Sequence, residues 1–114
     1  MTPEEIVTSV FARVRARDIR VADLYAEDAT LYSHDGVHRG RDAIRAFYKN
    51  VVEVTKPNPQ VVGLFVNLPT VAAVINAGTT EHIANAVDVF QVEDGEIRSM
   101  RICMVVDVPA VAGA

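Results

Sequence analysis

The chain has 114 residues, of which 50% are hydrophobic and 23% are charged. This size and apolar content predict one globular domain with a buried core, and they exclude a disordered chain. No apolar run approaches the ~20 residues of a membrane-spanning helix, so no membrane role is expected. The formal net charge of −4 argues against nucleic-acid binding, which normally needs a basic surface. The one cysteine excludes an internal disulfide, and the acidic first residues predict no secretory signal, hence a cytoplasmic protein.

The first part of the chain has the pattern of a helix with a complete N-terminal cap. Thr2 suits the N-cap, Pro3 the first helical position and Glu5 the third position of a capping box. Apolar residues then recur with a period near 3.6, which predicts one buried face: Ile6, Val7, Val10, Phe11 and Val14. The arginines toward the end of this helix are interpreted as a solvated face: Arg13, Arg15 and Arg17. Asp18 is expected to cap a second, short helix that carries Ile19, Ala22, Leu24 and Tyr25.

One strand and one further helix precede a change of period. The strand is predicted from Ala29 to about His34, and the helix from near Gly40 to a loop at Lys56–Pro59. Beyond this loop the apolar residues alternate, which predicts strands at 61–66, 70–78, 82–92 and 96–107. The order α-α-β-α-β-β-β-β predicts one α+β domain over residues 1–114, with a core at about 3–106. Three helices would pack on one face of a mixed, largely antiparallel sheet, which bends into a cone with a pocket at its mouth.

Three short segments of the chain occur in a recognisable order. They are Tyr25–Thr30, then Arg39–Ile44 with Phe47-Tyr48, then Asp88–Phe90 with Glu93–Ile97. In this order and spacing the chain resembles the nuclear transport factor 2-like superfamily, and within it the ketosteroid isomerase and SnoaL-like branch. The resemblance implies a pocket for an apolar small molecule but leaves the reaction open, because the fold hosts isomerases, epoxide hydrolases, cyclases, dehydratases and non-enzymes. No cofactor is expected, and no metal, because the histidines lack a ligand spacing.

The resemblance implies only part of the catalytic set of ketosteroid isomerases. Their general-base aspartate corresponds to Ser33, which cannot act as that base unaided. Their oxyanion-hole tyrosine on the first helix corresponds to Val10, and two supporting tyrosines correspond to Tyr25 and Tyr48. Their second oxyanion-hole acid corresponds to Asp88. Negligible activity on 3-oxo-Δ5 steroids is therefore expected.

The pocket implied by this resemblance has four candidate catalytic residues: Asp88, Ser33, His34 and Tyr48. His34 adjoins the vacant base position, and a histidine near a carboxylate can serve as a general base at neutral pH. Because neighbouring strand residues point to opposite faces, Ser33 and His34 can both face inward only if the strand ends there. The expected lining consists of Val10, Phe11, Val14, Tyr25, Leu31, Phe47, Ala86, Phe90, Met100, Ile102 and Met104.

Asp88 is also singled out by its position in the middle of a predicted apolar strand. Burial there would raise its pKa, and the neutral acid could donate a hydrogen bond to a ligand oxygen. The alternative is a structural ion pair with Arg101. A two-residue Asp94-Gly95 loop would bring Arg101 opposite Asp88, whereas a three-residue loop with a left-handed Gly95 would bring Met100 there. The resemblance favours the three-residue loop.

Together these patterns predict an enzyme that acts on an apolar small molecule, with an acid or oxyanion-hole role for Asp88. The alternative is a non-catalytic ligand-binding or dimerisation module of the same fold. A homodimer is expected because Ile83, Val87 and Val89 alternate with the pocket residues and would leave an apolar outer face exposed.

Overall fold

The computed structural model describes the backbone of residues 1–76 and 82–109, and the side chains of residues 1–76 and 86–103. Two helical segments open the chain: α1 (Pro3–Arg15) and the short 3₁₀ helix η1 (Ile19–Leu24). A hairpin and a further helix follow: β1 (Tyr25–Ser33), β2 (Gly36–Arg39) and α2 (Arg41–Asn50), which continues as the π-helical turn η2 (Val51–Thr55). Four strands complete the described part: β3 (Gln60–Asn67), β4 (Thr70–Asn76), β5 (His82–Glu93) and β6 (Glu96–Pro109).

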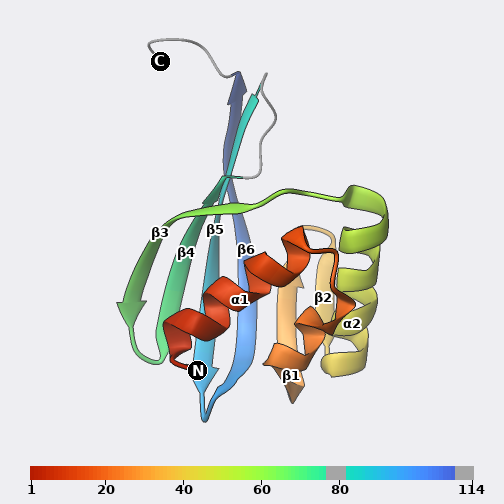
Figure 1. Cartoon of the computed structure of the whole chain (residues 1–114), viewed down its shortest axis with the longest axis vertical. Helices are drawn as coiled ribbons and strands as arrows, with labels where there is room; N and C mark the ends of the chain where they lie inside the picture. The colour runs from red at the N-terminus through yellow and green to blue at the C-terminus, as the bar shows by residue number, and fades with distance from the viewer. Residues whose placement is uncertain (77–81, 110–114) are drawn as a thin grey trace.

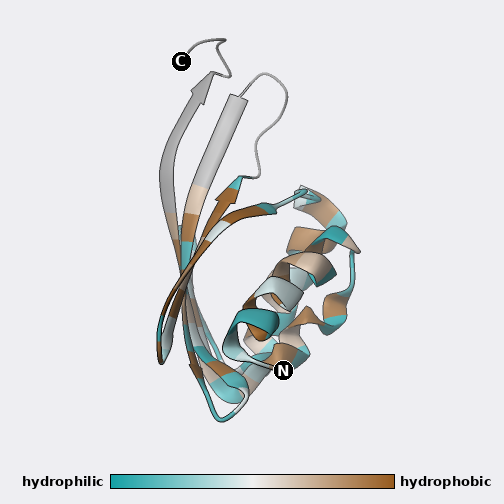
Figure 2. Ribbon diagram, turned by 60° about the vertical axis from the view of Figure 1, so that its left-hand side comes forward, coloured by the Kyte–Doolittle hydropathy of each residue, from teal (hydrophilic) through white to brown (hydrophobic). Residues whose placement is uncertain are grey.

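The described strands form one six-stranded sheet in the order β2-β1-β6-β5-β4-β3. The pairing is antiparallel except between β1 and β6, which run parallel, so the sheet is mixed. The sheet curves, and the helices lie on its concave side, with α1 across the strands and α2 beside it (Figure 1; Figure 2). The predicted α+β fold, with its helices on one face of a bent sheet, is confirmed. No helix in the described residues is long and apolar enough to cross a membrane.

Helix α1 begins with the predicted capping box. The Thr2 N–H donates to Glu5 Oε1 (2.8 Å), and the Glu5 N–H donates to Thr2 Oγ1 (3.1 Å). These bonds satisfy N–H groups that a helix start otherwise leaves unpaired. The apolar residues predicted on the inner face of α1 are all buried: Ile6, Val7, Val10, Phe11 and Val14. The helix is therefore anchored to the concave side of the sheet by this face.

The hairpin of β1 and β2 differs from the prediction. β1 begins at Tyr25 rather than near Ala29, so Tyr25 belongs to the sheet and not to the second helix. β2 was not expected, because its four residues are largely exposed and have no apolar alternation. It forms because a two-residue turn brings Gly36 opposite Ser33. The strand thus ends at Ser33, and His34 lies in the turn.

The turn between β5 and β6 contains two residues, Asp94 and Gly95. Both have a positive φ, 53° and 76°, and the flanking Glu93 and Glu96 pair with each other. Turns with two left-handed residues match the twist of antiparallel strands. The three-residue loop favoured by the resemblance is therefore wrong.

A bulge in β6 then shifts the register. Gln91 pairs with Ser99, whereas the residue after Gln91 pairs with Ile97, so Arg98 is the extra residue. Neither loop considered from the sequence includes this shift, and neither gives the correct neighbour for Asp88.

As a result of the bulge, Asp88 lies opposite Ile102. Directly paired residues share a sheet face, so Ile102 and Met100 lie on the concave side with Asp88. Arg101 and Cys103 alternate with them and lie on the convex side, where both are exposed. The predicted faces of these residues are therefore confirmed, although the predicted register is not.

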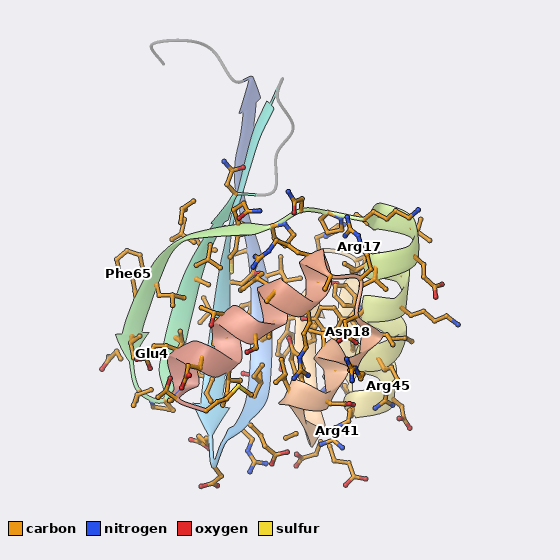
Figure 3. The ribbon with its side chains drawn as sticks, viewed as in Figure 1. Glu4, Arg17, Asp18, Arg41, Arg45 and Phe65 are labelled. Atoms are coloured by element: carbon orange, nitrogen blue, oxygen red, sulfur yellow. The ribbon has the colours of Figure 1, made fainter. Side chains whose placement is uncertain are left out.

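The convex face of the sheet is apolar over β3, β4 and β5, and Arg101 of β6 continues the same row. Phe65 on β3, Ala72 on β4 and Val89 on β5 form one row. Phe65 is 65% exposed and projects from β3 at the edge of the molecule (Figure 3). Val87 lies in the next row, and the side chain of Ile83 lies outside the described residues. An exposed apolar surface of this kind is a typical association surface.

Candidate functional site

A cavity of about 250 Å³ lies between the helices and the concave face of the sheet. Its helical side is formed by apolar residues and one phenol: Val10, Phe11, Val14, Phe47, Tyr48 and Val51. Its sheet side is formed by residues of three strands: Ile75, Ala86, Asp88, Met100 and Ile102. Its rim is formed by the β1–β2 turn and the segment before β3: Ser33, His34, Thr55, Pro57 and Pro59. The described lining thus combines apolar walls, a buried acid and a more polar rim.

Asp88 is the buried carboxylic acid of this cavity. Asp88 is only 7% exposed, and no hydrogen bond from the described residues reaches its Oδ1. Its direct neighbours across the strands are Ala73 and Ile102, which offer no polar atom from their side chains. Burial raises the pKa of Asp88 from 3.8 to about 7, because the charged form loses its hydration. At neutral pH a large share of this carboxyl is therefore protonated.

The alternative ion pair between Asp88 and Arg101 does not form. Arg101 lies opposite Val89 on the convex face, and its guanidinium stacks over the Tyr32 ring at 4.2 Å from the centroid. The cation is thus held by a cation–π contact on the far side of the sheet from the cavity.

Two tyrosines form a buried hydroxyl pair next to the acid. The hydroxyl oxygens of Tyr25 and Tyr48 are 2.6 Å apart, and either can be the donor. Burial raises the pKa of both phenols, and the negative charge of Asp88 raises both further. Both hydroxyls therefore stay protonated, and their mutual bond uses only one of the two protons. When Tyr25 donates, Tyr48, which lines the cavity, keeps a proton for a further acceptor.

The polar rim is organised by the hydroxyl of Ser33. It donates a short hydrogen bond to the Asp35 carboxylate and lies 3.3 Å from His38 Nε2. The hydrogen bond from Ser33 is the main cause that lowers the pKa of Asp35. His38 Nε2 also lies 3.6 Å from Asp35 Oδ1. Ser33 and Asp35 thus both lie at Nε2 of the His38 ring. In a catalytic Ser-His-Asp triad, the serine and the aspartate instead bind opposite nitrogens of the histidine ring.

The prolines of the rim are held by two arginines at the C-terminal end of α1, of which Arg15 is its last residue and Arg17 follows it. Arg15 donates to the Pro59 carbonyl (2.8 Å), and Arg17 donates to the carbonyls of Pro57 (2.6 Å) and Lys56 (2.9 Å). Arg17 lies where α1 ends, below the segment that leads into β3 (Figure 3). Arg17 is exposed, in agreement with the predicted solvated face, whereas Arg15 is half-buried. The sequence analysis did not predict that backbone carbonyls about forty residues away in sequence accept hydrogen bonds from both side chains.

The four candidate catalytic residues all border the cavity: Asp88, Tyr48, Ser33 and His34. Ser33 and His34 both face it because β1 ends at Ser33. Seven residues of the expected lining also border it: Val10, Phe11, Val14, Phe47, Ala86, Met100 and Ile102. Three do not, because they are fully buried in the core: Tyr25, Leu31 and Phe90. The side chain of Met104 lies outside the described residues.

Five residues of the lining were missed by the sequence analysis: Val51, Thr55, Pro57, Pro59 and Ile75. Strand alternation carried the signal for Ile75, which shares a face with Val71 and Ala73. The other four lie in the turn and loop after α2, where no periodicity reports which side chains face inward.

A second hollow of about 340 Å³ lies near the start of α2 and is polar: Glu27, Arg39, Gly40, Arg41, Asp42 and Arg45. Arg45 pairs with Asp42 (2.9 Å) and Asp23 (3.3 Å), and Arg41 pairs with Glu96 (3.5 Å). These paired charges stabilise the junction of helix and sheet, so the hollow is not a candidate site.

A sequence model of the SnoaL-like domain family matches residues 7–100. The chain belongs to the SnoaL-like domain family. The resemblance inferred from three short segments is thereby confirmed. A search of curated proteins found no match. In the described part of this SnoaL-like domain, no group of three or more His, Cys, Asp or Glu side chains could hold a metal ion.

Solved structures similar to this SnoaL-like domain share its fold at low sequence identity. An NTF2-like protein of unknown function from Cytophaga hutchinsonii has a TM-score of 0.79 at 15% identity, over 92% of this chain and 91% of that one. A candidate polyketide cyclase from Sinorhizobium meliloti has a TM-score of 0.70 at 19% identity, over 86% of this chain and 93% of that one. A de novo designed protein with a curved β-sheet has a TM-score of 0.78 at 11% identity, over 90% of this chain and 84% of that one. These likenesses show the fold alone.

Proposed function

We propose that this SnoaL-like domain is an enzyme that binds an apolar small molecule through one carbonyl or hydroxyl oxygen. In this proposal the protonated carboxyl of Asp88 donates a hydrogen bond to that oxygen. The observation that carries the proposal is the buried Oδ1 of Asp88, which has no partner in the described residues. Native interiors rarely leave such atoms unpaired, because each costs about 1–3 kcal/mol. A ligand oxygen would supply the missing partner.

The chemistry supported best is stabilisation of an oxyanion formed from a carbonyl. A neutral acid in an apolar site can donate to a developing negative charge, and the low dielectric strengthens that bond. Tyr48 borders the same cavity and would offer a second donor. In ketosteroid isomerases, which this chain resembles, a general base moves a proton from the carbon next to a carbonyl. The printed description of the Sinorhizobium meliloti structure as a candidate polyketide cyclase is compatible with this reaction class.

His34 is our candidate for the group that accepts this proton. It borders the cavity at the rim, and an imidazole can take a proton at neutral pH. Ser33 is unsuited to that role because a neutral hydroxyl is too weak a base to take a proton from carbon. In this scheme the proton moves from the carbon to the His34 ring while Asp88 keeps its proton and stabilises the oxygen.

Deuterium exchange into β-tetralone tests this proposal. We expect the domain to accelerate exchange at the carbons next to the carbonyl, measured by proton NMR in deuterated buffer. Asp88→Ala should slow the catalysed exchange by about 10²–10³, the usual effect of removing one oxyanion donor. Asp88→Asn keeps a donor and should lose less, and Asp42→Ala is the control at an exposed acid. Exchange at the buffer rate would contradict the proposal.

A second candidate function is ligand binding without catalysis. Ser33 favours it, because the position of the family base then holds a neutral hydroxyl in place of a carboxylate. This function predicts that β-tetralone binds and that Asp88→Ala weakens binding, while exchange stays at the buffer rate.

A further inference from the structure

The strand register gives the cavity a direction. Phe90 pairs with Met100 in one row, and Asp88 pairs with Ile102 in the next row. Ala86 stands two residues farther along β5. Each step of two residues advances about 7 Å along a strand. Phe90, Asp88 and Ala86 therefore stand in a line along β5 on the concave face, with Asp88 in the middle.

The inner end of this axis is closed at the Phe90 row. Phe90 is fully buried and does not line the cavity, because Phe11 covers it in an edge-to-face contact with ring centroids 6.0 Å apart. Met100 completes this floor. A ligand cannot extend past these side chains without displacing core residues.

The outer end lies beyond Ala86. Leu31 on β1 is level with Met100, so Ser33 is level with Ile102 and Asp88, and His34 stands one residue farther out. The rim prolines precede β3, whose first residue is level with Asn76, one position beyond the Ile75–Ala86 pair. On the β3 side of the cavity, Ala86 thus lies between Asp88 and the rim prolines, and its side chain is only a methyl group.

The volume of the cavity limits the size of the ligand. An engineered apolar cavity of roughly 150 Å³ holds one benzene molecule. By proportion, the cavity of about 250 Å³ holds on the order of ten ring carbons. Among the described lining residues there is no lysine or arginine, so an anionic ligand beside Asp88 would have no countercharge. The space suits a neutral molecule of two fused rings.

We propose, on the basis of the function proposed above, that the ligand is a neutral ketone or phenol of one or two six-membered rings. Its oxygen lies inward at Asp88, and its second ring lies over Ala86 toward the rim. Ala86 therefore determines the number of rings that the cavity accepts.

A series of ketones of increasing size tests this inference on the unmodified protein. Dissociation constants are measured by NMR titration with cyclohexanone, β-tetralone and a four-ring ketosteroid. We expect β-tetralone to bind at least tenfold more tightly than cyclohexanone, because the second ring buries further apolar surface. The four-ring ligand should gain nothing beyond β-tetralone. A ketosteroid that binds tenfold more tightly than β-tetralone would overturn the inference.

Ala86→Leu fills the space of the second ring and gives the sharper test. The variant should bind β-tetralone at least tenfold more weakly, and its dissociation constant for cyclohexanone should stay within about twofold of the wild-type value. Ala72→Leu is the matched control, because Ala72 lies on the convex face and should change neither constant. Equal weakening of both ketones by Ala86→Leu would overturn the inference, and circular dichroism establishes that each variant is folded.

The same ligands separate this inference from the function on which it rests. If Asp88→Ala leaves β-tetralone affinity unchanged while Ala86→Leu still discriminates by ring number, the proposed hydrogen bond fails and the size assignment stands. If Asp88→Ala weakens both ketones while Ala86→Leu does not discriminate, the size assignment fails and the proposed hydrogen bond stands.

Discussion

The burial of Asp88 makes the stability of the fold depend on pH in a defined window. Burial raises the pKa of this carboxyl from 3.8 to about 7. One pKa unit corresponds to about 1.36 kcal/mol, so ionisation of Asp88 costs the folded state roughly 4 kcal/mol. Asp88→Asn keeps the shape of the side chain and removes the titration.

The sign of the effect follows from proton binding. Between pH 3.8 and about pH 7 the folded state holds the Asp88 proton and the unfolded state has lost it. The free energy of unfolding therefore falls as the pH rises through this window, and it levels off above about pH 7. Between pH 4 and pH 8, the free energy of unfolding of the Asp88→Asn variant should rise relative to that of the wild type by up to roughly 4 kcal/mol.

Urea unfolding followed by circular dichroism, at intervals from pH 4 to pH 8.5, measures this difference. Asp42→Asn is the matched control, since its side chain is fully exposed. Parallel profiles for the wild type and Asp88→Asn would refute the reasoning. So would a midpoint at or below about 3.9, the ordinary aspartate value, in a carbon-detected NMR titration of the Asp88 carboxyl. Because the neutral acid is the donor, ligand binding should also weaken as the pH rises through about 7.

Three further outcomes are expected. Arg17→Gln removes two hydrogen bonds to the rim and should speed both association and dissociation of β-tetralone several-fold in stopped-flow experiments. Arg20→Gln, on the surface away from the rim, serves as the control, and unchanged rates for Arg17→Gln would count against a rim held by this residue. We propose that the convex face forms a homodimer, so Val89→Glu should give a monomer by ultracentrifugation, whereas a monomeric wild type at micromolar concentration would exclude the dimer. Activity on 3-oxo-Δ5 steroids should be negligible, because Ser33 and Val10 lack the base and the oxyanion hydroxyl of ketosteroid isomerases, and general-base catalysis alone contributes ~10²–10⁴-fold. Ready turnover that His34→Gln leaves unchanged would show that the base lies elsewhere.

The elements that the sequence predicts well are those with a local signal. The capping box at Thr2 and Glu5 defines the start of α1, and the apolar periods define its buried face and the four long strands. The short β2 carries no such signal, because four exposed residues cannot show a period. The bulge at Arg98 is also invisible locally. This side chain approaches Asp28, which is distant in sequence, and a contact of that range is not encoded in any one segment.

The candidate site divides in the same way. The burial of Asp88 follows from alternation on an apolar strand, so the sequence is sufficient to single it out. The rim could not be predicted, because the arginines that hold it lie at the end of α1 and just after it, whereas the carbonyls they bind lie after η2. Nor does the sequence distinguish Tyr48, which borders the cavity, from Tyr25, which lies beneath it in the core.

The parallel pairing of β1 with β6 governs the order in which the chain can fold. Leu31 pairs with Met100, so strands from opposite ends of the described chain become neighbours in the sheet. The hairpins from β3 to β6 can form from local contacts, whereas the β1–β6 contact must first close a long loop. During synthesis on the ribosome the β1–β2 hairpin emerges early, yet it gains its neighbour only when β6 has left the exit tunnel. Docking of these two strands is therefore expected to limit the folding rate, and the N-terminal third of the chain is made first and completed last.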